Sequence, residues 1–126
     1  MTKRMISATD QYFEALSQIN QDDFLSCFAV DAALHDPYGG KPFVGSEGLG
    51  KWFDGFEKTW KEFSIAAEES YSSGDGTAVK WAATGATHSG KKASFSGIDV
   101  FFLDENGLIL RMDGYWDAAA MMAQIR

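Results

Sequence analysis

Residues after position 60 form four runs in which apolar and polar residues alternate. Alternation with a period of two is typical of strands that bury one face. Glycine-containing connectors of the kind that close hairpins separate the runs, among them Gly74-Asp75-Gly76 and Asp104-Glu105-Asn106-Gly107. The pattern predicts an antiparallel meander with strands at 63–71, 76–88, 92–103 and 108–116, followed by a short helical tail over 117–122.

The first half of the chain instead spaces its apolar residues three and four positions apart, as in helices. Ser7 or Thr9 would cap a first helix, Asn20 a second, and Ser46 with Glu47 would open a third. Their apolar faces are, in order, Tyr12, Phe13, Leu16 and Ile19; Phe24, Leu25 and Phe28; and Leu49, Trp52, Phe53, Phe56 and Trp60. We interpret the aromatic residues of the third helix as core. Helices followed by a meander predict an α+β domain with helices packed on a curved sheet.

One more strand, ending at an Asp-Pro pair, is predicted between the second and third helices. Val30, Ala32 and Leu34 alternate with more polar positions, and Asp36 continues their face. Pro37 lacks the amide donor that a strand needs, and it keeps the preceding residue extended. A carboxylate at the end of this strand is therefore expected to point toward the apolar side. The alternative is an ordinary turn with a solvated aspartate.

Two further polar groups fall on apolar faces. Asp99 is the one charge on a face that also holds Ala93, Phe95, Gly97, Phe101 and Leu103. A register shifted by one residue would instead turn Asp99 to solvent. Tyr12 lies on the apolar face of the first helix, where a buried phenol needs a hydrogen-bond partner. With Asp36, these groups would form an apolar pocket with a few convergent polar groups, which is typical of a small-molecule site.

Composition narrows the functional classes. A length of 126 residues predicts one domain over 1–126, and a net charge of -7 argues against nucleic acid and against an anionic membrane surface. The single cysteine, Cys27, and the absence of an apolar signal segment after the basic start, residues 1–6, predict a cytoplasmic protein. With two histidines and no clustered ligands, neither a metal nor a cofactor is expected.

Three segments, 33–39, 97–107 and Tyr115-Trp116, resemble the ketosteroid isomerases (steroid delta-isomerases) of the wider NTF2-like and SnoaL-like group, and the resemblance covers nearly the whole chain. It implies a cone-shaped α+β fold, in which N-terminal helices pack on a curved antiparallel sheet around a pocket. It also implies that Asp36 is a general base, with Tyr12 and Asp99 as donors to an oxyanion. An aspartic acid that stays neutral is already known for this family.

The activity that the resemblance implies is isomerisation of a β,γ-unsaturated ketone through a dienolate, without a cofactor, on a small hydrophobic molecule such as a steroid. Two alternatives remain: a polyketide cyclase or dehydratase, and a protein that only binds a small hydrophobic ligand. The expected pocket residues are Phe28, Phe53, Phe95, Phe101, Met112 and Trp116.

Some residues depart from the family pattern. Phe28 and Phe53 stand where some members carry tyrosines that support the oxyanion tyrosine, and Lys80 falls near an apolar part of the family pocket. On the other face of the strand at 92–103, Ile98, Val100 and Phe102 form an apolar surface. Because such surfaces mark interfaces, we expect a two-fold homodimer through the sheet.

Overall fold

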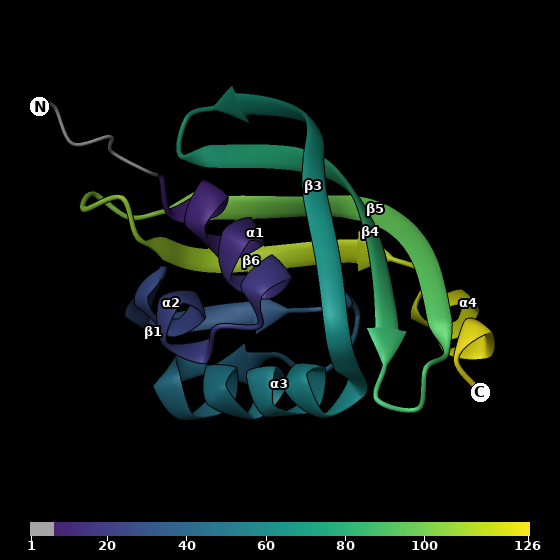
Figure 1. Ribbon diagram of the computed structural model, residues 1–126. Helices are drawn as coiled ribbons and strands as arrows, with labels where there is room; N and C mark the ends of the chain where they lie inside the picture. Colours follow the sequence, from purple (N-terminus) through teal and green to yellow (C-terminus); the bar gives the residue numbers. More distant parts are fainter. Residues whose placement is uncertain (1–6) are drawn as a thin grey trace, which may run out of the picture.

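Six strands form one curved sheet in the order β2-β1-β6-β5-β4-β3, and α1, α2 and α3 lie against one side of it (Figure 1). The computed structural model describes residues 7–126, so the basic start of the chain lies outside the described residues. The elements are α1 (Ala8–Gln18), α2 (Gln21–Ser26), β1 (Phe28–His35), β2 (Phe43–Val44), α3 (Gly45–Thr59), β3 (Trp60–Ser73), β4 (Gly76–Thr87), β5 (Lys92–Leu103), β6 (Ile109–Trp116) and α4 (Ala118–Gln124). The predicted α+β fold class is confirmed.

The four long strands pair in chain order as an antiparallel meander, as predicted. Beyond the meander, β1 pairs in parallel with β6, and the two-residue strand β2 pairs with β1. We call the side of the sheet that faces α1 and α3 the inner face and the opposite side the outer face. None of the helices within residues 7–126 is long and apolar enough to span a membrane.

The polar caps begin three of the four helices. Ser7 accepts a hydrogen bond from the Asp10 amide, Asn20 from the Asp23 amide, and Asp117 from the Ala120 amide. Each side chain satisfies an amide that the first turn leaves free. The third helix, α3, begins at Gly45, one residue before the expected Ser46, and holds Glu47 in its first turn; β2 leads directly into it, and no side chain caps it.

The alternation predicted for residues 30–36 holds only toward the end of β1. Ala32 and Leu34 are fully buried, but Val30 is 86% exposed. The pairing of β1 with β6 shifts between Phe28 and Ala33. An irregularity of this kind changes which face the side chains point to, so the placement of Val30 on the buried face is wrong.

The register of β5 agrees with the alternation. Asp99 is 3% exposed on the inner face, whereas its neighbour Ile98 is 44% exposed on the outer face. The main hydrophobic core lies between the inner face and α1 to α3, and it includes Tyr12, Leu34 and Phe101. The alternative in which Asp99 faces solvent is therefore excluded.

Candidate active site

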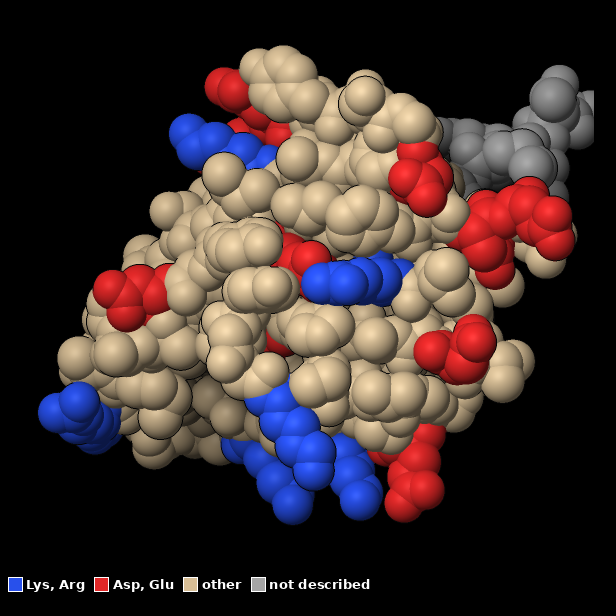
Figure 2. Space-filling view, turned by 180° about the vertical axis from the view of Figure 1, so that it is seen from behind, with Lys and Arg blue, Asp and Glu red and all other residues tan. Residues whose placement is uncertain are grey.

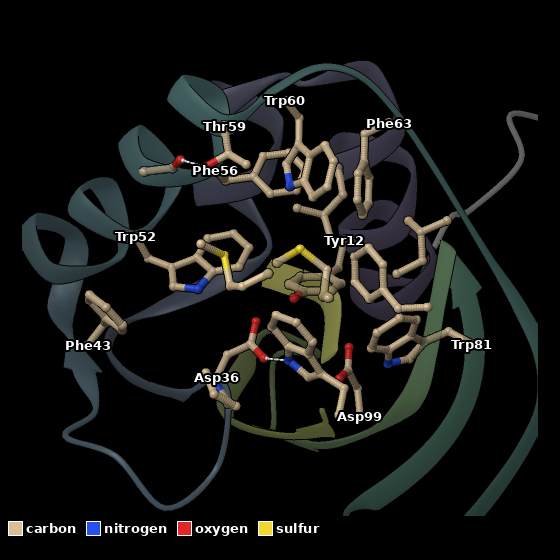
Figure 3. A pocket seen from close by; sticks show the side chains of 18 of the residues that line it. Tyr12, Asp36, Phe43, Trp52, Phe56, Thr59, Trp60, Phe63, Trp81 and Asp99 are labelled. Carbon is tan, nitrogen blue, oxygen red and sulfur yellow. Dashed lines mark hydrogen bonds between the residues drawn. The ribbon is translucent and has the colours of Figure 1, made fainter. Parts of the chain in front are cut away.

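A cavity of about 360 Å³ opens between α3, α4 and the inner face of the sheet. Small-molecule pockets in proteins span about 300–1,000 Å³. Aromatic side chains dominate its walls, with Trp52 and Phe56 on α3 and Trp60 at the start of β3 (Figure 3). Three charged residues line it: Asp36, Asp99 and Lys51. The Lys51 side chain is 71% exposed, so the titratable groups of these three that lie within the cavity are the two carboxyl groups.

Tyr12, Asp36 and Asp99 line this one cavity, although they come from α1, the residue after β1, and β5. Tyr12 is 1% exposed, Asp99 is 3% exposed and Asp36 is half-buried. Figure 3 shows the Tyr12 hydroxyl and the two carboxyl groups turned toward the same part of the cavity. The convergence expected from the polar residues on apolar faces is therefore present.

Gly114 explains how two carboxyl groups fit side by side. It pairs with Asp99 across β5 and β6, and its amide oxygen accepts a 2.7 Å hydrogen bond from the Tyr38 amide, which holds the loop after Asp36 against β6. A Cβ atom on Gly114 would lie 2.5 Å from Asp36 Oδ1 and 3.1 Å from Asp99 Oδ1. The first distance is too short for a Cβ atom and the second is a tight contact, so the two carboxyl groups lie over the bare backbone of Gly114.

Gly97 leaves space for two tryptophans, as Gly114 does for the two carboxyl groups. Across the sheet it pairs with Trp81 on β4 and with Trp116 on β6. A Cβ atom there would lie 2.7 Å from the Trp116 Cβ and 2.7 Å from the Trp81 Cζ2. Trp116 Nε1 donates a hydrogen bond to Asp36 Oδ1. One indole therefore holds one oxygen of Asp36 and leaves the other free.

Burial sets the protonation of the three polar groups. It raises the pKa of Asp36 to about 6, while the hydrogen bond from Trp116 acts in the opposite direction. Burial and then the repulsion from Asp36 raise the pKa of Asp99 well above its usual value, and Trp81 opposes this rise. Burial, followed by the charges of Asp99 and Asp36, also raises the pKa of Tyr12. These shifts favour the neutral form of the Asp99 carboxyl group and of the Tyr12 phenol, and they leave the pKa of Asp36 below neutral pH.

The expected pocket residues divide into two groups. Phe95 and Trp116 line the cavity. Phe28, Phe53, Phe101 and Met112 do not, and they are buried in the core. Phe28 and Phe101 pack against the Tyr12 ring with centroid separations of 6.1 and 5.2 Å, so they form a layer behind the tyrosine.

Lys80, which departs from the family pattern, does not disturb the cavity. Its side chain is 56% exposed, and its Nζ lies 4.0 Å from Glu68 Oε1. Its neighbours Val79 and Trp81 are buried, so Lys80 points to the opposite side of β4.

Several cavity residues were not recognised from the sequence. Trp52, Phe56 and Trp60 were interpreted as core, and they do belong to the core or pack against it, but they also line the cavity. Helical spacing identifies an apolar face without showing whether it meets the core or a cavity. Trp81 was missed, although its place between Val79 and Ala83 in an alternating run indicates an inner-face position. Within residues 7–126 no group of three or more His, Cys, Asp or Glu side chains could hold a metal ion.

The comparisons with known proteins agree with this architecture. The crystal structure of an NTF2-like protein of unknown function from Exiguobacterium sp. 255-15 superposes with a TM-score of 0.75 at 18% identity, over 89% of this chain and 99% of that one. The fold is thus that of the NTF2-like α+β proteins. The model of the SnoaL-like domain family matches residues 9–112, so the chain belongs to that family. No curated protein is similar enough in sequence to match the chain.

Two other similar structures concern small hydrophobic molecules. One is SalBIII, an epoxide hydrolase/cyclase-like enzyme with a role in pyran ring formation in the polyether salinomycin; it has a TM-score of 0.79 and 21% identity, over 89% of both chains. The other is RV0760c from Mycobacterium tuberculosis in complex with estradiol-17beta-hemisuccinate, with a TM-score of 0.78 and 22% identity, over 89% of this chain and 92% of that one. At these identities the likeness shows a shared fold.

Proposed function

We propose that this protein isomerises a β,γ-unsaturated ketone of a small hydrophobic molecule, with a steroid as the first substrate to test. The observation that carries the proposal is the pair of carboxyl groups over Gly114, which face a phenol in an apolar cavity and whose pKa values burial raises, to about 6 for Asp36 and well above the usual value for Asp99. Two titratable groups whose environments push their pKa values apart are typical of acid–base catalysis. The steroid derivative bound by RV0760c supports a substrate of this size and polarity.

In the proposed reaction, Asp36 removes a proton from the carbon between the carbonyl group and the double bond. The C–H electron pair forms a dienolate, whose oxygen accepts hydrogen bonds from Tyr12 and neutral Asp99. Asp36, now protonated, returns the proton to the γ-carbon, and the double bond becomes conjugated with the ketone. A positioned base contributes roughly 10²–10⁴-fold, and an oxyanion donor about 10²–10³-fold.

Two features of the site support these roles. The hydrogen bond from Trp116 fixes one Asp36 oxygen, so the other oxygen is free to carry the proton between the two carbons. Phe28, which packs against Tyr12, cannot donate a hydrogen bond to its hydroxyl. We therefore expect slower turnover than in family members whose oxyanion tyrosine has hydrogen-bonded support.

A second candidate function is cyclisation, and the same pair of carboxyl groups favours it. Asp99 would give its proton to an epoxide oxygen while Asp36 takes the proton of an attacking hydroxyl group. One C–O bond of the epoxide breaks, and one C–O bond of the new ring forms. The likeness to SalBIII supports testing this reaction. The third candidate is a protein that binds a hydrophobic ligand without turnover.

The test follows the rise in ultraviolet absorbance as a β,γ-unsaturated 3-ketosteroid becomes conjugated. We expect Asp36→Asn to lower the rate about 10²–10⁴-fold while an unreactive steroid binds with unchanged affinity. Tyr12→Phe should lower the rate less, because Asp99 still donates. Asp31→Asn is the matched control, since it removes an exposed carboxylate from β1, the strand that leads to Asp36, and should leave the rate unchanged.

Each alternative result selects another function. If the wild-type protein binds the steroid but shows no turnover above buffer, the binding protein is the correct interpretation. If it neither binds nor converts steroids, an epoxide-bearing polyketide with a free hydroxyl group becomes the next substrate. Ring closure that disappears in both Asp36→Asn and Asp99→Asn would then support the cyclase.

We also propose that two copies associate through the outer face. Ile98 and its cross-strand partner Tyr115 are 44% and 48% exposed, and Tyr38 stacks on Tyr115 with a 5.0 Å centroid separation. Figure 2 shows that charges on the side opposite α1 and α3 are scattered over a mostly uncharged surface. Sedimentation at micromolar concentration should give a dimer, and Ile98→Lys should give a monomer. A monomeric wild-type protein would refute the association.

A further inference from the structure

Trp81 holds a buried hydrogen-bond donor that the proposed reaction does not yet use. The residue is 3% exposed on the inner face of β4, and its ring packs against Phe95 and Trp116 with centroid separations of 5.7 and 6.4 Å. Its Nε1 is sealed from solvent and lacks a hydrogen-bond partner among the described residues. An unpaired buried donor costs free energy of folding, so its presence beside the cavity needs an explanation.

The group beside this donor is the carboxyl of Asp99. Trp81 pairs with Gly97 and Val79 pairs with Asp99, so Trp81 and Asp99 occupy adjacent inner-face positions on neighbouring strands. Figure 3 shows the indole next to that carboxyl group. The indole N–H also acts on Asp99, since it lowers the pKa that burial raises. A ligand in the cavity would not reach Nε1, because that atom has no accessible surface.

We propose that Trp81 is a positioning residue that decides which oxygen of neutral Asp99 carries the proton. A neutral carboxyl group has one oxygen that donates and one that only accepts, and these two can exchange. An indole N–H only donates, so it favours the state in which the nearer oxygen is the bare carbonyl. The O–H is then left on the other oxygen, available to the substrate. This inference rests on the proposed function, in which Asp99 is the neutral donor.

The proposed arrangement of Trp81 and Asp99 has the same form as that of Trp116 and Asp36, the proposed base. Trp116 donates to one oxygen of Asp36 and leaves the other free for the proton. Trp81 would do the same for Asp99, and Gly97 provides the space that both indoles need. An N–H donated to the carbonyl oxygen also polarises the carboxyl group and strengthens the O–H as a donor. In apo structures such hydrogen bonds are often long or poorly aligned and tighten when the substrate binds.

Infrared spectroscopy of protein with isotope-labelled aspartate tests the inference. The carbonyl stretch of neutral Asp99 is the neutral-pH band that Asp99→Asn removes. Trp81→Phe should shift it to higher frequency, because the carbonyl oxygen loses a donor. Replacing Trp81 by β-(3-benzothienyl)alanine, which keeps the shape but lacks the N–H, should give the same shift. We expect kcat to fall about three- to tenfold in both variants, the worth of one neutral hydrogen bond, with KM unchanged.

The control is Trp60→Phe, which removes another buried indole from the cavity wall and should leave the Asp99 band in place. If neither Trp81 variant moves the band, the inference is wrong while the proposed function stands. A shift in Trp81→Phe alone would indicate altered packing and would also overturn the inference. If wild-type protein has no neutral-carboxyl band that depends on Asp99, the donor role of Asp99 fails, and with it the proposed mechanism.

Discussion

Two aspartates on neighbouring strands are almost equally buried, yet their surroundings are opposite. Asp113 on the outer face of β6 is 6% exposed, and its Oδ1 lies 2.9 Å from Arg111 Nε and 3.1 Å from His35 Nδ1. Asp99 on the inner face of β5 is 3% exposed, has no cationic partner among the described residues, and has a strongly raised pKa. Burial alone therefore does not distinguish a carboxylate in an ion pair from the carboxyl group proposed as a proton donor. The partners supplied by each face of the sheet do.

The end of β1 and its partner β6 contribute to both faces of the sheet, because adjacent residues of a strand point to opposite faces. His35 and Asp113 pair across β1 and β6 on the outer face. The residues that follow them, Asp36 and Gly114, belong to the cavity side. The contact between His35 and Asp113 thus lies at the end of the strand from which the proposed base extends.

The strongest way to break the inner arrangement is Gly114→Ala. The new methyl group would displace both carboxyl groups, because its position lies 2.5 Å from Asp36 Oδ1 and 3.1 Å from Asp99 Oδ1. A displacement of about 1 Å can cost roughly 10²-fold, so we expect at least about a hundredfold loss of steroid turnover. Gly50→Ala is the control, since a Cβ there would make only an ordinary 3.7 Å contact with Gln21 Nε2. Equal activities of the two variants would contradict the described geometry.

Replacing each of the two buried carboxyl groups separately should affect stability differently. Asp113→Asn breaks an ion pair whose arginine is half-exposed, and we expect it to lower the free energy of unfolding by about 1–3 kcal/mol. Asp99→Asn keeps the shape without the cost of a buried ionisable group, so the stability at neutral pH should stay the same or rise. Urea denaturation measures both. A large destabilisation by Asp99→Asn would mean that this carboxylate is ionised and paired.

Titration should separate the base from the acid. Because the pKa of Asp36 is raised from 3.8 to about 6, the rate should fall tenfold per pH unit below about 6. Between these two values the folded protein holds a proton that the unfolded chain has lost. The contribution of Asp36 to the free energy of unfolding therefore decreases as pH rises through this window, by up to about 1.4 kcal/mol per unit. In Asp36→Asn the slope between these two values should become smaller by the share of Asp36, while the share of Asp99, whose pKa is also raised, should remain. An unchanged slope would show that Asp36 does not titrate in this window.

The smallest expected effect concerns Trp116, whose indole donates a hydrogen bond to Asp36. Trp116 lowers the pKa of Asp36 through its hydrogen bond. In Trp116→Phe we expect the acid limb of the rate profile to move to higher pH by less than about one unit, within the usual influence of a single hydrogen bond. The position of this limb is read from kcat/KM against pH. A shift to lower pH would show that Trp116 does not stabilise the ionised form.

The sequence allowed the fold and the three polar groups to be predicted because both depend on regular periods. Twelve residues of alternation place Asp99 on the inner face without ambiguity once Ile98 is seen to be exposed. Val30 could not be placed, because the irregularity in β1 leaves no local mark in the sequence. Phe53 and Trp52 are neighbours on one helix, yet the first fills the core and the second lines the cavity. That difference depends on which part of the fold faces each side chain, and the periodicity of the sequence carries no information about it.

The surroundings of Asp113, on the outer face, could not be predicted from the sequence either. Its partner His35 lies on a strand far away in the chain, and only the parallel pairing of β1 with β6 brings them together. The sequence likewise did not identify the indole N–H groups of Trp81 and Trp116 as hydrogen-bond donors, because a tryptophan in an apolar run is interpreted as an apolar residue. Gly97, on the strand between them, leaves the space that both indoles occupy.

The pairing of β1 with β6 also determines when the site can form during folding. The hydrogen bond between Trp116 and Asp36 joins residues 80 positions apart, whereas the strands of the meander join through short hairpins. Closing a long loop is slower and entropically more costly than closing a hairpin. A partly folded chain with a complete meander would hold Asp99 but would leave Asp36 unplaced. During refolding, recovery of turnover should therefore report the docking of β1 on β6 and lag behind the formation of sheet.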